Sequence, residues 1–257
     1  MKKFKLIIVT TLVLLASLSA NTPLTGTQII EKSYNRPTSK DQAAILTMTL
    51  TNKNGQTRVR KIQQFSKDLG DKEKNIMFFV SPADVKNTSF MNWTYNSDKS
   101  DDQWIYLPAL KKIKRISSDS KSNYFMGSDF TYDDLGDRKI NADIHTLLRE
   151  ESLNDKECYV IESKSQDEDY MYSKTITWID KETFIGMKKE FYDEDAELLK
   201  ILEVKKVEKF SDLYIITHSE MKNVQKDHST TITLNNVNIN SGISEDKFTE
   251  RMMTRGI

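Results

Sequence analysis

Apolar and polar residues alternate with a period of two along most of the chain after residue 40, and this pattern predicts β-strands. In residues 44–51, Leu46, Met48 and Leu50 fall on one face, while threonines dominate the other. Asn54-Gly55 follows, which is the strongest short signal for a β-hairpin, so a returning strand is predicted at residues 57–65. The first part of the chain therefore predicts antiparallel pairing.

Similar runs, rich in β-branched and aromatic residues, recur to the C-terminus between clusters of turn residues. They predict strands at residues 75–80, 85–95, 103–107, 145–151, 157–163, 174–180, 185–192, 198–208, 213–221 and 229–237. About a dozen tightly connected strands indicate a mainly β (α+β) fold with a large, curved antiparallel sheet. One face of this sheet is expected to be apolar and the other to be polar and exposed to solvent.

Only one clear amphipathic helix is predicted, at residues 25–34. Thr25 and Gln28 have the spacing of a capping box, and Ile29, Ile30, Ser33 and Tyr34 fall on one helical face. A large sheet cannot leave its apolar face open to water. This helix and the apolar loop at residues 125–130 are therefore expected to plug the sheet.

The stretch from residue 101 to residue 138 combines a strand, a basic run and this loop. Trp104 and Tyr106 share one face of the strand, and Pro108 ends it because proline has no N–H for the ladder. The basic run 111–116 follows, which fits either an anionic partner or an edge strand protected by lysines. Gly127 interrupts the apolar loop, so a positive φ or a close backbone approach is predicted there.

Two motifs in this stretch resemble those of the outer membrane lipoprotein-sorting protein family, the LolA-like periplasmic proteins often associated with RND-type exporters. They are Trp104-x-Tyr106-Leu107-Pro108-x-x-x-Lys112-x-x-Arg115-Ile116 and Phe125-Met126-Gly127-Ser128-Asp129-Phe130-x-Tyr132-x-Asp134-Leu135. Weaker matches cover most of the chain after its first two dozen residues. The resemblance implies a LolA/LolB-like incomplete β-barrel with a short α-helical lid over an apolar cavity. Asp195-Ala196 departs from the Asp-Gly common in the family, which leaves the turn type there open.

Residues 1–20 have the basic start, apolar run and small C-terminal residues of a signal peptide. The apolar run is too short to span a bilayer comfortably, so cleavage is expected, with residues 21–257 forming a single LolA-like lipid/lipoprotein-binding domain in the periplasm. Basic and acidic residues balance at 38 each, and loss of the signal would remove three lysines. The charge argues against a nucleic acid partner.

The sequence contains few residue patterns that are typical of catalytic sites. His145, His218 and His228 lie far apart in predicted strands or at their edges, and the single Cys158 lies in an apolar strand. The carboxylates around Asp129 and Asp134 lack the spacing of a calcium loop. They are expected to fix the loop by accepting backbone N–H groups or by pairing with a base such as Arg115. No enzymatic role, metal or cofactor is therefore predicted.

The candidate site is the apolar cavity, with a group of motif residues that shape it. Its predicted ligand-binding residues are large and apolar: Leu46, Met48, Leu50, Phe90, Trp93, Trp104, Tyr106, Phe125, Met126 and Phe130. Its predicted motif and structural residues are Pro108, Arg115, Gly127, Ser128, Asp129 and Asp134. Such a pocket suits a hydrophobic ligand, because burying each methylene contributes about 0.8 kcal/mol.

The sequence thus favours a monomeric periplasmic carrier for a lipid or a lipoprotein acyl chain, with an RND-type inner-membrane exporter as a candidate partner through the family resemblance. The alternative is a non-catalytic accessory module of a membrane transport complex, with a filled core. A lipid hydrolase that uses the Asp cluster is a third, less favoured interpretation.

Overall fold

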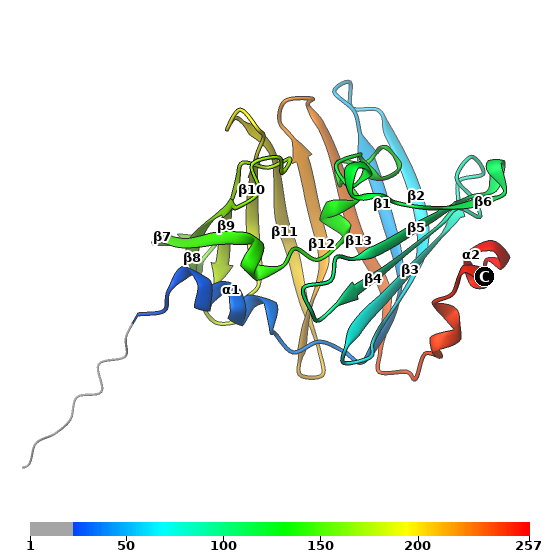
Figure 1. Cartoon of the computed structure of the whole chain (residues 1–257), viewed down its shortest axis with the longest axis horizontal. Helices are drawn as coiled ribbons and strands as arrows, with labels where there is room; N and C mark the ends of the chain where they lie inside the picture. The colour runs from blue at the N-terminus through cyan, green and yellow to red at the C-terminus, as the bar shows by residue number, and fades with distance from the viewer. Residues whose placement is uncertain (1–22) are drawn as a thin grey trace, which may run out of the picture.

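The computed structural model describes residues 23–257, which form one antiparallel sheet of 13 strands in the order β6-β5-β4-β3-β2-β1-β13-β12-β11-β10-β9-β8-β7 (Figure 1). The first six strands are β1 (Asp41–Thr51), β2 (Thr57–Asp68), β3 (Lys72–Ser81), β4 (Ser89–Tyr95), β5 (Asp102–Leu107) and β6 (Lys112–Arg115). The others are β7 (Asp143–Leu153), β8 (Lys156–Ser165), β9 (Lys174–Asp180), β10 (Gly186–Tyr192), β11 (Leu198–Phe210), β12 (Leu213–Asn223) and β13 (His228–Ile239). The edges β6 and β7 do not pair, so the sheet stays open.

The predicted strands are confirmed with small shifts at their ends, because turn residues mark most of the connections. The Asn54-Gly55 turn joins β1 and β2 in the register Met48↔Arg60. Consecutive strands pair except for β6 and β7, and β1 pairs with β13, where Met48 lies opposite Ile232. That long-range pairing unites the two halves of the sheet. The predicted large curved antiparallel fold is therefore confirmed.

Two segments lie on one face of the sheet, here called the inner face (Figure 1). The first is the connection between β6 and β7, which contains short 3₁₀ turns at Phe125–Gly127, Asp133–Leu135 and Ile140–Ala142. The second is α1 (Gly26–Tyr34), whose capping box between Thr25 and Gln28 forms as predicted. Its Ile29 is fully buried against Ile161 of β8 and Ile179 of β9. The helix thus covers the β7–β9 end of the sheet, where it packs against Ile161 and Ile179.

The opposite, outer face carries a second apolar cluster that is covered by the C-terminal segment. This segment contains a 3₁₀ turn at Glu245–Lys247 and α2 (Glu250–Arg255), which the sequence pattern did not reveal. Trp93, Trp104 and Tyr106 pack in this outer cluster around the buried Phe248 and Met253. They were expected to line one cavity with Leu46 and Phe90. That placement is wrong, because strand alternation puts Trp93 on the face opposite to Phe90.

Neither α-helix within residues 23–257 has the length and apolar character needed to cross a membrane. The predicted signal peptide at residues 1–20 lies outside the described residues.

Candidate functional site

The loop at residues 125–130, which was predicted to plug the sheet, lies within residues 123–135, here called the plug. Phe125 is fully buried at its centre, with ring centroids 5.1 Å from Phe90 and 5.9 Å from Phe79. Leu46, Met48 and Leu50 belong to the same buried cluster, and Met126 packs at its border. The apolar floor of the predicted cavity is therefore filled by the plug itself.

The plug turns at Met126 and Gly127, where φ is +50° and +73°. The predicted positive φ at Gly127 is confirmed. Side chains hold this turn at both ends, since Ser128 Oγ donates to the Phe125 carbonyl at 2.7 Å and the Arg60 guanidinium donates to the Met126 carbonyl. The close packing of Phe125 thus depends on a backbone shape that few residue types adopt without strain.

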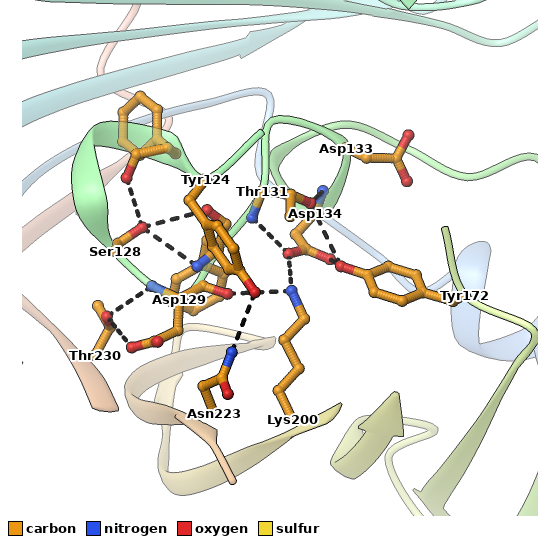
Figure 2. Close-up of polar contacts among 12 residues, drawn as sticks. Tyr124, Ser128, Asp129, Thr131, Asp133, Asp134, Tyr172, Lys200, Asn223 and Thr230 are labelled. Carbon is orange, nitrogen blue, oxygen red and sulfur yellow. Dashed lines mark hydrogen bonds and ion pairs between the residues drawn. The ribbon is translucent and has the colours of Figure 1, made fainter. Parts of the chain in front are cut away.

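Lys200 of β11 anchors the plug from the sheet (Figure 2). Its side chain is fully buried, and Nζ donates to Asp134 Oδ2 at 2.5 Å and to the Asp129 carbonyl at 3.1 Å. Burial lowers the pKa of Lys200, while the charge of Asp134 opposes this effect. A buried ion pair of this kind fixes geometry, because breaking either side leaves an uncompensated charge.

Two of the plug carboxylates, Asp129 and Asp134, have further partners that tie distant strands together (Figure 2). Asp134 accepts from the Thr131 backbone N–H at 2.7 Å and from the Tyr172 hydroxyl at 3.0 Å. Asp129 accepts from Thr230 Oγ1 at 2.7 Å and lies 2.7 Å from Nδ1 of His228. The predicted loop-fixing role is thus confirmed for Asp134.

The expected pairing of these carboxylates with Arg115 is wrong. Arg115 pairs with Asp102, which lies beside it on the outer side of the β5–β6 hairpin. Pro108 begins a 3₁₀ turn between these two strands, as its lack of an N–H predicts. The motif residues therefore serve two separate regions, the plug and the β5–β6 hairpin.

A cavity of about 1330 Å³ opens on the inner face between α1, the strands β2 to β4 and residues 134–143. Its apolar walls come from Met77, Phe90, Leu135 and Ile140, and its polar walls include Asn75, Asn92 and Thr94. Phe90 alone among the ten predicted ligand-binding residues lines it. The open space is hence more polar than expected and lies beside the filled apolar cluster.

A smaller cavity of about 290 Å³ lies between residues 130–138 and strands β8 to β12. Phe130, Phe191, Leu202 and Met221 form an apolar part of its wall, and the rest of the wall carries charged and polar side chains. Residues Asp134, Gly136, Asp137 and Asp143 line both cavities, which therefore meet at the segment that follows the plug.

The ionisable groups singled out in the sequence have structural partners. His145 contacts Ser163 Oγ and the Ile140 carbonyl, His218 contacts Thr233, and His228 contacts Asp129. Cys158 is buried, and burial raises the pKa of its thiol. Within residues 23–257 no cluster of three potential metal ligands occurs.

Sequence analysis did not identify Lys200, Tyr172, Asn223 or Thr230 as partners of the plug. One signal was available for Lys200, which interrupts the apolar run Leu198-Leu199-Lys200-Ile201-Leu202 in a strand. A lysine in such a run is rarely buried without a partner. The partner itself could not be inferred, because it lies 66 residues away.

The fold of this chain recurs in solved structures. An outer membrane lipoprotein-sorting protein domain from Vibrio parahaemolyticus is 33% identical, with a TM-score of 0.83 over 90% of this chain and 98% of its own. The chain belongs to the outer membrane lipoprotein-sorting protein family. A family model described as "Uncharacterized protein" matches residues 71–255.

Two further solved structures are similar to this chain. A DUF1329 family protein from Desulfovibrio piger is 26% identical, with a TM-score of 0.83 over 89% of this chain and 97% of its own. A LolA superfamily protein from Nitrosomonas europaea shares the fold at 19% identity, with a TM-score of 0.68 over 89% of this chain and 99% of its own. No curated protein matches the chain.

Proposed function

We propose that the protein is a periplasmic carrier that binds the acyl chain of a lipid or lipoprotein on the inner face of its sheet, and that residues 21–257 act as one binding domain. The observation that carries this proposal is the inner-face cavity of about 1330 Å³ in a member of the lipoprotein-sorting family. That volume exceeds the range of roughly 300–1,000 Å³ typical of small-molecule sites, so it has room for a long chain.

The lining suits an amphiphile better than a pure hydrocarbon. Met77, Phe90 and Leu135 offer apolar contact, and each buried methylene of a ligand contributes about 0.8 kcal/mol before ordering costs. The amide oxygens of Asn75 and Asn92 are buried without a protein partner. They offer acceptors for the polar part of a cargo or for water that bridges to it.

A cavity-filling variant tests this proposal. Asn75→Trp places an indole in the cavity and is expected to abolish saturable binding of a fluorescent fatty acid while the protein remains folded. Lys61→Trp is the matched control, because Lys61 is exposed on the outer side of the neighbouring strand β2. Normal binding by Asn75→Trp, or no saturable binding by the wild type, would refute a carrier that uses this cavity.

One observation favours a second candidate, an accessory module of a membrane transport complex that carries no lipid. The cluster around Leu46, Met48 and Leu50 is filled by Phe125, as a structural core would be. An RND-type inner-membrane exporter fits either function as the partner. Mass spectrometry of protein purified from its own periplasm separates the two, since a carrier is expected to retain lipid and a module is not.

A further inference from the structure

Lys189 stands out in the smaller inner-face cavity because its ammonium has no direct partner. It lies on β10 opposite Leu202 of β11 and Thr177 of β9, and Nζ lies 5.1 Å from the Phe191 ring centroid. Within residues 23–257 no hydrogen-bond acceptor or carboxylate contacts Nζ directly. Burial lowers the pKa of Lys189, as expected for an ammonium that lacks a contacting carboxylate.

The charged groups nearest to Lys189 already have partners. Asp134 pairs with Lys200 at 2.5 Å, and Asp143 pairs with Arg138 at 2.5 Å. Asp133 accepts from the Tyr170 hydroxyl at 2.5 Å. Lys174, which also lines the cavity, pairs with Glu162 at 3.2 Å. Among the residues that the structure describes, the positive charge of Lys189 is thus the one in this cavity that a ligand can still neutralise by contact.

Part of the wall beside this ammonium is apolar, and the rest carries charged and polar groups that include the paired Asp133, Asp134 and Asp143. Phe130, Phe191, Leu202 and Met221 line the cavity, whose volume of about 290 Å³ equals that of roughly ten water molecules. An ammonium without a contacting acceptor, next to an apolar wall, recognises an anionic group carried by a hydrocarbon chain, because a charge-assisted hydrogen bond is strongest away from water. This cavity and the larger one share a wall formed by Asp134, Gly136, Asp137 and Asp143.

We infer that Lys189 forms an anion subsite for the carboxylate or phosphate end of an amphiphilic cargo, whose chain extends along the inner face. This inference rests on the proposed carrier function and specifies in addition that the ligand is anionic. It predicts that the protein prefers anionic to neutral amphiphiles of the same chain length.

The test compares palmitate with hexadecanol, which has the same chain length without the charge. The wild type is expected to bind palmitate about 10-fold more tightly, as a charge-assisted hydrogen bond would give. Lys189→Met should remove this preference by weakening palmitate alone. Lys188→Met is the matched control and should keep the preference, because Lys188 faces the other side of β10 over Trp178 and pairs with Glu190.

The outcomes separate this subsite from the carrier function. Binding of neither ligand by the wild type would refute the carrier, and the subsite with it. Equal binding of both ligands would refute the subsite and leave the carrier standing. Equal weakening of both by Lys189→Met would show that the residue acts only on the fold. Inorganic phosphate that binds as tightly as palmitate would overturn the assignment to an amphiphile.

Discussion

Ala196 adopts a left-handed backbone with φ of +61° in the turn between β10 and β11. The left-handed region costs a residue with a Cβ about 1–2 kcal/mol, and glycine avoids most of this cost. Ala196→Gly is therefore expected to raise the free energy of unfolding by about 0.5–1 kcal/mol after the entropy cost of glycine. Urea denaturation measures the change.

Ala83→Gly is the matched control for that prediction, since Ala83 is also exposed in a turn but has an ordinary negative φ. It should lower the free energy of unfolding slightly, because glycine raises the conformational entropy of the unfolded chain. Equal effects of the two substitutions would show that the backbone conformation of Ala196 carries no cost.

Asp102 makes the stability of the β4–β6 region depend on pH. Burial acts to raise the pKa of its carboxyl, but hydrogen bonds from Tyr95 and Lys99 and the ion pair with Arg115 prevail and lower it to about 2. Because the pKa of Asp102 is lower in the folded state, its ionised carboxylate stabilises the fold at pH values above the unfolded pKa of about 3.9. This contribution is therefore complete at neutral pH and is lost as pH falls toward 2.

Asp102→Asn tests this coupling. At pH 7 the variant is expected to be less stable than the wild type by about 1–2 kcal/mol, a range reduced for the exposure of Lys99 and Arg115. The difference should shrink between pH 4 and pH 2, which denaturation at several pH values measures. A difference independent of pH would contradict ionisation of Asp102 as its source.

At the scale of elements, the plug is held by one buried lysine. Lys200→Met is expected to lower the free energy of unfolding by about 3–5 kcal/mol, because Asp134 then remains buried and unpaired. Adding Asp134→Asn removes that charge, so the double variant should be more stable than Lys200→Met alone. Additive losses in this double-mutant cycle, measured by urea denaturation, would show that the two groups do not interact.

At the scale of the whole molecule, the β2–β5 half of the sheet is apolar on both faces, and a different distant segment covers each. The plug covers the Leu46 cluster on the inner face, while the C-terminal segment covers the outer face through the fully buried Phe248 and Met253. The sheet therefore resembles the middle layer of a three-layer domain in this half.

Phe248→Ala tests how much the outer layer contributes. Loss of a fully buried phenylalanine is expected to lower the free energy of unfolding by about 3–5 kcal/mol. Ile257→Ala serves as control, since this side chain at the end of the same segment is exposed and should change stability by less than about 0.5 kcal/mol. A loss similar to that of the control would mean that the segment is bound only weakly.

Local signals in the sequence determined the strands, the capped helix and the need for glycine at position 127. Strand alternation depends only on neighbouring residues, and a capping box or a hairpin turn is complete within four residues. The resemblance to the family motifs further predicted that the curved sheet stays open. The same alternation separates Phe90 from Trp93, so the division of the aromatic residues between two faces was also present in the sequence.

Only the tertiary structure decided which segments cover those faces and which charges meet. β1 pairs with β13 almost 190 positions later, and Lys200 meets Asp134 from 66 residues away. Contacts of this range depend on how the whole sheet curves and where the plug crosses it, and no local pattern encodes either. For the same reason, the unpartnered ammonium of Lys189 became visible only once the surrounding carboxylates had been placed.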